Sequence, residues 1–346
     1  MTTGRRAFLG LSAWTAGISG LHAYLNVNFS GLRDSMRSRD RLQTLVVAGL
    51  PVTCNLTLPI ACAARNMERS FRANFEYKRF NGWPEVKEAL ISGQINAAYM
   101  LAPLVMDLVT KDVPVKIVSI GHRSGAVIMV HKESTYRKFQ DLAGKRIAIP
   151  SRFAVDFLFL RKMLAREGMS DKDVKIVEMP PPDMPAALYA KAVDAYCTGE
   201  PYGAAAQRAG YAVPLSMTRD EWPNYICCVL TVRQELIDQN PDLVQDLVNH
   251  VQGAGRWLDS DRAHRAKAAE IAADIKYFNQ DRAVIQYVMD NPTDRVTYGD
   301  LEMVKAEFDD MMELSIQAGT LKRSIPFESY TDSRFMKAAV PATIAL

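Results

Sequence analysis

An internal repeat is the feature that most limits what this chain can fold into. Residues 83–103 read WPEVKEALISGQINAAYMLAP, and residues 181–201 read PPDMPAALYAKAVDAYCTGEP. At an offset of 98 residues, the two stretches share five identical positions. Each copy has a proline near a helix start, one apolar helical face, a short strand and a turn that ends in proline. The repeat therefore predicts two related α/β halves.

The likeness extends upstream of both copies. LVVAGLP, residues 45–51, predicts a strand that runs into a turn at Pro51. KRIAIPSRFAVDFLFLRKMLAREG, residues 145–168, predicts a similar strand, an Ile-Pro turn and an amphipathic helix. Each half then presents two loops that follow strands, and ligands of open α/β sheets bind at that edge. We expect the four loops to face one crevice.

Two other β-rich stretches are suited to carry the chain between the halves. The first is residues 113–132, which is broken by Gly121 and Gly125, and the second is residues 225–232. We predict an α/β fold of two lobes joined by two crossover strands, with a helical C-terminal segment. Residues 42–122 with 229–346 would form lobe 1, and residues 123–228 would form lobe 2.

Glu200 stands between Gly199 and Pro201, where a predicted strand meets a predicted helix. Proline is tolerated in the first helical turn, so we expect the helix to begin at Pro201. In the repeat, Glu200 takes the place of Ala102. A carboxylate at this position either faces a ligand in the crevice or favours the positive end of the helix dipole, and the pattern leaves both alternatives open.

Composition excludes several classes of protein. The chain has 346 residues, of which 48% are hydrophobic and 23% charged, as in ordinary globular proteins of one large or two medium domains. The net charge is +3 with acids and bases interspersed, so we expect no nucleic-acid partner. An odd cysteine count with an adjacent pair argues against a disulfide framework, and no CxxC or His-rich spacing predicts zinc or another cofactor. The five cysteines are Cys54, Cys62, Cys197, Cys227 and Cys228.

Residues 1–41 predict an export signal or anchor. Arg5 and Arg6 precede Phe8 and Leu9, and the first acidic residue is Asp34. This order resembles the twin-arginine signal, an address read by the export machinery at the membrane. We expect a periplasmic protein, either released or tethered by an uncleaved segment. The alternative is an amphipathic helix that remains part of the protein.

Four stretches carry a resemblance to a known family: residues 82–103, 160–184, 195–205 and 220–248. Together they resemble the nitrate, sulfonate and bicarbonate binding components of ABC importers over roughly residues 42–320. The resemblance implies a periplasmic binding protein of type II fold, which closes on a small solute and delivers it to permease and ATPase subunits. It implies a transport protein rather than an enzyme.

The resemblance also suggests the site. Trp83 matches the tryptophan that holds the oxyanion in the nitrate and bicarbonate members, whereas their lysine falls on Cys228, their histidine on Asp156 and a polar residue on Ala126. Because a buried anion needs paired donors, we expect a neutral or cationic solute unless Arg123 or Arg152 replaces the lost cation. The candidate ligand-binding residues are Trp83, Pro51, Ala102, Gly125, Arg152, Asp156, Glu200, Tyr202 and Cys228.

Two other functions remain as alternatives. Proteins similar to this family make a pyrimidine precursor of thiamine with a histidine, and Cys227 with Cys228 offers thiol chemistry. Against an enzyme, the chain has no GxSxG, HExxH or phosphate-loop motif, and no histidine near either Gly-Glu-Pro or Trp-Pro. The second alternative is a receptor that presents its ligand to a sensor.

Overall fold

The computed structural model describes residues 43–68, 73–222 and 225–346. The chain divides into two compact units, residues 1–43 with 70–73 and residues 44–69 with 74–346. The described residues belong to the second unit, except Gln43 and Ala73. The predicted export signal lies outside the described residues. Within them, no helix is both long and apolar enough to span a bilayer.

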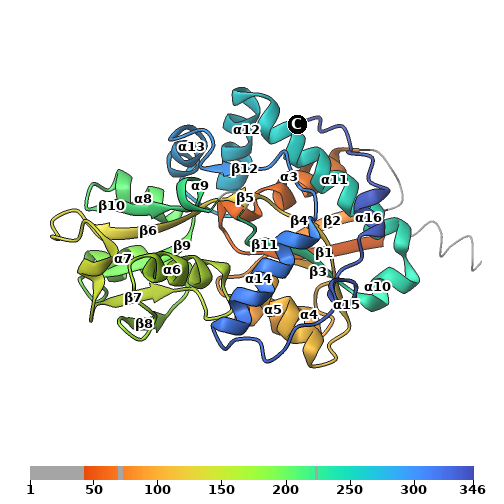
Figure 1. Cartoon of the computed structure of the whole chain (residues 1–346). Coiled ribbons are helices and arrows are strands. Elements are labelled where there is room, and N and C mark those ends of the chain that lie inside the picture. The colour runs from red at the N-terminus through yellow and green to blue at the C-terminus, as the bar shows by residue number, and fades with distance from the viewer. Residues whose placement is uncertain (1–42, 69–72, 223–224) are drawn as a thin grey trace, which may run out of the picture. The chain divides into compact units, whose positions relative to one another are not determined.

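The first sheet has five strands within the described part of the chain (Figure 1). Its order is β2 (Ala73–Arg79), β1 (Gln43–Gly49), β3 (Ala97–Leu101), β11 (Cys228–Arg233) and β4 (Val115–Ile120). β1 and β3 are parallel, whereas β11 is antiparallel to both β3 and β4. Every residue of β3 is buried, as expected for a central strand with both faces covered.

The second sheet has the same plan. Over the described residues, its order is β10 (Ala212–Met217), β6 (Ala126–His131), β9 (Ala195–Gly199), β7 (Arg146–Ile149) and β8 (Lys175–Glu178). β7 and β9 are parallel, and β6 is antiparallel to β9 and β10. Taken from the other end, β8-β7-β9-β6-β10 corresponds strand for strand to β2-β1-β3-β11-β4. The prediction of two related α/β lobes is confirmed, and β3 and β9 are the strands that the sequence repeat aligned.

The chain passes between the two sheets at the two predicted places. It leaves the first sheet after β4, passes through β5 (Arg123–Ser124) and enters the second sheet at β6. It returns to the first sheet at β11. β5 pairs with β12 (Val296–Thr297) of the C-terminal segment, with Val296 opposite Ser124. The residue limits given above for the two lobes stay a prediction.

Helices follow or precede the strands of each sheet. Those of the first lobe are η1 (Thr53–Asn55), α3 (Thr57–Met67), α4 (Trp83–Ile91) and α5 (Ala102–Thr110). Those of the second are η2 (Phe139–Leu142), α6 (Val155–Arg166), η3 (Pro181–Asp183), α7 (Met184–Tyr189), α8 (Tyr202–Arg208) and α9 (Thr218–Glu221). The C-terminal helices are α10 (Gln234–Gln239), α11 (Pro241–Ser260), α12 (Arg262–Ala273), α13 (Arg282–Asp290), α14 (Lys305–Gln317), α15 (Phe327–Tyr330) and α16 (Arg334–Lys337).

Helix starts follow the expected chemistry, with one correction. At the start of α4, the Gly82 N–H donates to the Glu85 carboxylate over 2.8 Å, as in a capping box. α11 begins at Pro241 after Asn240, as predicted. The prediction that a helix begins at Pro201 is wrong by one residue, because Pro201 is the N-cap and α8 begins at Tyr202.

Candidate functional site

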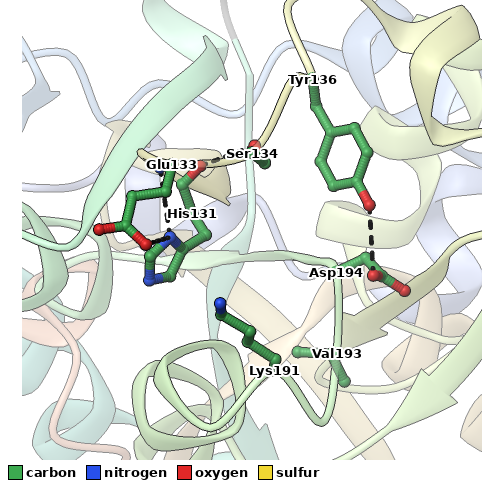
Figure 2. A pocket seen from close by; sticks show the side chains of 7 residues that line it. All are labelled: His131, Glu133, Ser134, Tyr136, Lys191, Val193 and Asp194. Carbon is green, nitrogen blue, oxygen red and sulfur yellow. Dashed lines mark hydrogen bonds and ion pairs between the residues drawn. The ribbon is translucent and has the colours of Figure 1, made fainter.

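One surface pocket of about 200 Å³ lies on the second lobe (Figure 2). It is lined by His131, Glu133, Ser134, Tyr136, Lys191, Val193 and Asp194. The Tyr136 hydroxyl donates to the Asp194 carboxylate over 3.3 Å. Val193 and Asp194 precede β9, whereas the predicted ligand edge follows β9, at Glu200. The pocket therefore lies at the opposite edge of the second sheet from the predicted site.

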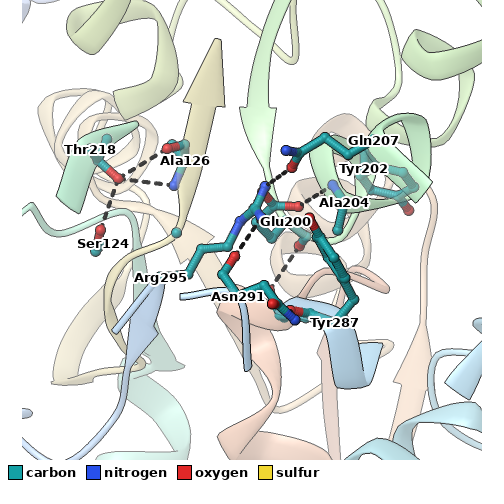
Figure 3. A network of polar contacts seen from close by, with 12 residues as sticks. Ser124, Ala126, Glu200, Tyr202, Ala204, Gln207, Thr218, Tyr287, Asn291 and Arg295 are labelled. Carbon is teal, nitrogen blue, oxygen red and sulfur yellow. Dashed lines mark hydrogen bonds and ion pairs between the residues drawn. The ribbon is translucent and has the colours of Figure 1, made fainter. Parts of the chain in front are cut away.

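Glu200 lies at the predicted strand end, but its carboxylate is fully occupied by protein groups (Figure 3). The side chain is buried and forms an ion pair with Arg295, whose Nε donates to Glu200 Oε1 over 2.7 Å. The other oxygen accepts the Ala204 N–H over 2.8 Å. Arg295 also donates to the Gln207 side chain and to the Asn291 carbonyl. Glu200 thus ties α8 to the C-terminal segment instead of facing a ligand.

The backbone of Glu200 connects the two lobes. Its carbonyl accepts the Thr53 N–H over 2.7 Å, and its N–H donates to the Gly125 carbonyl over 2.8 Å. The Tyr202 hydroxyl donates to the Pro51 carbonyl over 3.3 Å. Four of the predicted site residues, Pro51, Gly125, Glu200 and Tyr202, are therefore brought together by contacts between protein groups.

Three predicted residues have other surroundings. Trp83 is buried at the first position of α4, and in the described part of the chain no polar contact links it to Glu200 or Asp156. The Ala102 N–H donates to the Cys227 carbonyl over 3.4 Å at the start of α5. Arg152 is 47% exposed and pairs with Glu178, so it does not supply a buried cation.

Asp156 and Cys228, on which the resemblance is expected to place the family's histidine and lysine, lie in one buried group of polar side chains. We call this group, which comprises Asn55, His122, Asp156, Tyr225, Cys227 and Cys228, the polar cluster. Asp156, in the first turn of α6, is 2% exposed, and one of its oxygens has no hydrogen-bond partner within the described residues. Its other oxygen lies 4.0 Å from the Cys227 sulfur.

The other members of the polar cluster lie in or near segments that adjoin strands β1, β4 and β11 of the first sheet. The sulfurs of Cys227 and Cys228 are 3.6 Å apart, and the Cys228 N–H donates to His122 Nε2 over 3.4 Å. Asn55, which follows β1, uses its side-chain oxygen to accept the Leu50 N–H over 2.8 Å. Among the described residues, the Asn55 amide nitrogen, His122 Nδ1 and the Tyr225 hydroxyl make no hydrogen bond of ordinary geometry, although Asn55 interacts with Cys228 and Tyr225 interacts with Asp156 and Cys227.

Burial sets the charge of the polar cluster. Desolvation raises the pKa of Asp156 to about 7, although its own backbone N–H and the nearby Tyr225 hydroxyl favour the charged form. Burial lowers the pKa of His122 to about 4, so this imidazole is neutral at pH 7. The pKa of the Cys227 thiol is raised by the neighbouring Cys228 thiol and by burial, and burial also raises the pKa of Cys228. Both thiols are therefore protonated and poor nucleophiles.

The cations near the polar cluster already have partners. Arg123 pairs with Asp300 and Glu307 at 3.0 Å each, and Arg295 pairs with Glu200. The arginines that the sequence offered as replacements, Arg123 and Arg152, are thus engaged with carboxylates elsewhere.

Sequence reasoning missed Asn55, His122, Tyr225 and Arg295. His122 was passed over because it lies far along the chain from Gly-Glu-Pro and Trp-Pro, yet it is hydrogen-bonded to the backbone of Cys228. A usable signal was its place next to Gly121, where the first predicted β-rich stretch is broken: strand β4 ends at Ile120, and residues just after strand ends face the ligand edge. Arg295 carried no such signal.

A family model described as the NMT1-like family matches residues 42–273. Among curated proteins, the nitrate/nitrite binding protein NrtA of Nostoc sp. (strain PCC 7120) is 26% identical over 274 residues, which cover 72% of this chain and 61% of NrtA. The chain thus spans less than two thirds of that relative. Parts of the chain also match the nitrate import ATP-binding protein NrtC of Synechocystis and the bicarbonate transport ATP-binding protein CmpC of Synechococcus elongatus.

Solved structures share the fold. The ligand-binding component of an ABC-type import system from Staphylococcus aureus with zinc bound has a TM-score of 0.78 and 26% identity, and the match covers 87% of this chain and all of that one. The periplasmic nitrate-binding protein NrtA from Synechocystis also has a TM-score of 0.78, at 18% identity, with 86% of this chain and 88% of that one covered. The desulfurization enzyme DSZB has the same fold at a TM-score of 0.62, 17% identity and 85% and 98% coverage, so the fold alone does not separate transport from catalysis.

Proposed function

Because the chain belongs to the NMT1-like family, we propose that it is the solute-binding component of an ABC importer. The matches to nitrate-binding proteins and to ATP-binding proteins of importers support this proposal. The two lobes, residues 42–122 with 229–346 and residues 123–228, would close on a small solute and present it to permease and ATPase subunits. No bond is made or broken in this function.

The solute class follows from one observation, the unpartnered groups of the polar cluster. Buried polar atoms normally have hydrogen-bond partners, and a buried carboxyl oxygen without one marks a place where a ligand completes the set. The cluster offers a carboxyl, an amide, a phenol, an imidazole and two thiols, while Arg123 and Arg295 are bound to other carboxylates. We propose a neutral or cationic solute, because the polar cluster, as far as the structure describes it, contains no cationic side chain that would neutralise an oxyanion beside Asp156.

The relatives' names do not decide the solute. One name refers to nitrate and nitrite, which are anions, and another to bound zinc, which is a cation. The residues that we propose for solute binding are Asp156 and Cys228 among those predicted from sequence, together with Asn55, His122, Tyr225 and Cys227. Pro51, Gly125, Glu200 and Tyr202 would hold the lobes in register around them.

A thermal-shift panel on the purified protein tests this function. Neutral and amine solutes and metal ions form one set, and nitrate, bicarbonate, taurine and a simple sulfonate form the other. A ligand at a hundredfold excess over its Kd stabilises the folded state by about 2.7 kcal/mol. We expect stabilisation from the first set, lost in Asp156→Asn and kept in the matched control Glu178→Gln, which removes an exposed carboxylate. Stabilisation by a sulfonate or nitrate that persists in Asp156→Asn contradicts the proposed charge.

A scattering experiment tests the mechanism. If the lobes close on the solute, small-angle scattering shows compaction when the stabilising ligand is added. Tight binding without any change in dimensions argues against a two-lobed clamp.

We also propose export to the periplasm by the twin-arginine route. The support is the Arg5-Arg6 pair and the membership in a family whose relatives include periplasmic proteins. Replacing both arginines by lysine keeps the charge but removes the pattern that the receptor recognises. The precursor should then stay in the cytoplasm, and unchanged export would exclude this route.

A further inference from the structure

Three potential metal ligands converge inside the polar cluster. A ring nitrogen of His122 and the sulfurs of Cys227 and Cys228 all lie within 4.8 Å of one another, and all three residues are buried. All five cysteines are free thiols, so the adjacent pair is not consumed by a disulfide. This is one histidine and two cysteines, a common donor set for zinc in proteins.

The local fold explains why adjacent residues aim their thiols at one point. Side chains alternate between the two faces of a strand, but β11 begins only at Cys228, so Cys227 is free of that alternation. β4 is the neighbour of β11, and the Gly121 N–H donates to the Cys228 carbonyl over 3.0 Å. His122 is the next residue along the chain and is thereby held beside both thiols.

The distances suit a bound ion. With Zn–S bonds of about 2.3 Å and tetrahedral angles, two sulfur ligands of one zinc ion lie about 3.8 Å apart. The observed separation is 3.6 Å, far longer than the roughly 2.05 Å of a disulfide bond.

A fourth group faces the triad from the second lobe. Asp156 Oδ2 lies 4.0 Å from the Cys227 sulfur, and Oδ1 has no hydrogen-bond partner in the described structure. Asp156 is 2% exposed and comes from α6, which follows strand β7 of the second sheet. A metal ion at this point would draw ligands from both lobes and would favour the closed arrangement.

We propose that His122, Cys227 and Cys228 bind a thiophilic transition-metal ion, Zn²⁺ or Cu⁺ in class, with Asp156 as the fourth group. Thiolate and imidazole ligands select these ions over Mg²⁺ and Ca²⁺, which require oxygen ligands. The metal site itself does not depend on the proposed transport function. Only the further statement that this ion is the transported solute rests on that function. Spacing along the chain did not predict the site, because His122 and Cys228 are 106 residues apart in the sequence.

Metal titration of the full-length protein tests the site. The protein is kept reduced, and Zn²⁺ or Cu⁺ is added in competition with a chromogenic chelator. We expect one equivalent to bind to the wild type and to the matched control Cys62→Ser, which removes a buried thiol in α3 that is not a ligand. Binding should weaken at least a hundredfold in Cys227→Ser, Cys228→Ser and His122→Ala, and at least tenfold in Asp156→Asn. Mg²⁺ and Ca²⁺ should not compete.

X-ray absorption of the metal-loaded wild type gives a readout that does not depend on how well the variants fold. Sulfur neighbours at about 2.3 Å and a nitrogen at about 2.0 Å support the site for zinc. A first shell of oxygen only, no binding of either ion, or equal binding by the Cys227→Ser and Cys62→Ser variants overturns the inference. An intact-mass measurement that shows a reductant-resistant disulfide between Cys227 and Cys228 also overturns the inference.

The two proposals fail in different ways. If an amine or neutral solute stabilises the protein through Asp156 while neither metal binds, the metal site is wrong and the transport function stands. If a metal binds at the triad but no ligand compacts the protein, the metal site stands and the transport function is wrong.

Discussion

Two buried carboxyl groups at the same edge of the second lobe have opposite environments. Glu200, after β9, has an arginine ion pair and a backbone N–H donor, whereas Asp156, after β7, has an oxygen without a partner among the described residues. Both are almost completely buried. A buried carboxyl keeps its charge where a partner pairs with it, and desolvation favours its neutral form where no such partner is present, as the raised pKa of Asp156 indicates. Glu200 is therefore part of the framework, and Asp156 is available to a ligand.

The largest expected effect comes from breaking the Glu200 ion pair. Arg295→Met leaves Glu200 as an uncompensated buried charge, which costs about 3–5 kcal/mol of unfolding free energy. Chemical denaturation measures it, with Arg152→Met as the matched control, because Arg152 pairs with Glu178 at the surface and such pairs contribute about 0–1 kcal/mol. The double variant Glu200→Gln/Arg295→Met should recover part of the loss. Equal stability of the two arginine variants would refute the framework role of Glu200.

The next largest loss of stability is expected from a substitution at Gly125, whose carbonyl accepts a hydrogen bond from the Glu200 N–H. Its φ is +97°, and an added Cβ would lie 3.0 Å from Val296 and 3.2 Å from the Cys54 sulfur. Gly125→Ala should lose about 1–3 kcal/mol, because the backbone strain adds to this contact. Gly144→Ala is the control, since Gly144 has φ +72° but no neighbour within 4 Å of the added Cβ. Chemical denaturation measures the free energy of unfolding of both variants. An equal decrease in both would mean that the close packing around Gly125 contributes nothing to stability.

A smaller effect is expected at His250, a buried titratable group that, like Glu200, has charged partners. His250, on α11, lies 3.1 Å from both Glu68 and Asp246, with Arg65 on the other side of Asp246. Burial lowers its pKa, but the two carboxylates outweigh burial and the net pKa is raised. A raised pKa stabilises the folded state below the unfolded value near 6.5, and this contribution disappears as pH rises through the folded pKa.

Wild type should therefore lose stability relative to His250→Gln between about pH 6 and pH 8. We expect a difference of about 0.2–1 kcal/mol, because both carboxylates are partly exposed. Denaturant titrations at several pH values measure it. A difference that grows with pH would mean that His250 is neutral in the folded protein.

The smallest loss of stability is expected at Asp156, for which the described residues provide no ion pair. Asp156→Asn should cause no loss of unfolding free energy in the ligand-free protein at pH 7, because burial raises the pKa of Asp156 and the amide removes the cost of burying the charged form. The same variant should abolish stabilisation by the solute. A loss of several kcal/mol, similar to that of Arg295→Met, would show that Asp156 is a framework residue like Glu200.

The sequence alone predicted the two related α/β lobes and the strand ends at which we propose the site. The offset of 98 residues aligned β3 with β9, and hydrophobic strands that end in proline turns identified the loops at Pro51 and Glu200. These features are local, because periodicity and turn chemistry act over a few residues. The replacement of the family's histidine and lysine by Asp156 and Cys228 stays a prediction from the resemblance.

Only the tertiary structure decided which polar groups meet. Arg295 is separated from Glu200 by 95 residues, and His122 from Cys228 by 106, so no local pattern reports either contact. Arg152 was a good candidate along the chain but pairs with Glu178 at the surface. Hydrogen bonds and ion pairs depend on distances of a few ångströms between side chains, and packing of the two sheets fixes those distances. For this reason Glu200, the residue that the sequence singled out, is bound by the protein itself, while one Asp156 oxygen has no hydrogen-bond partner in the part of the chain that the structure describes.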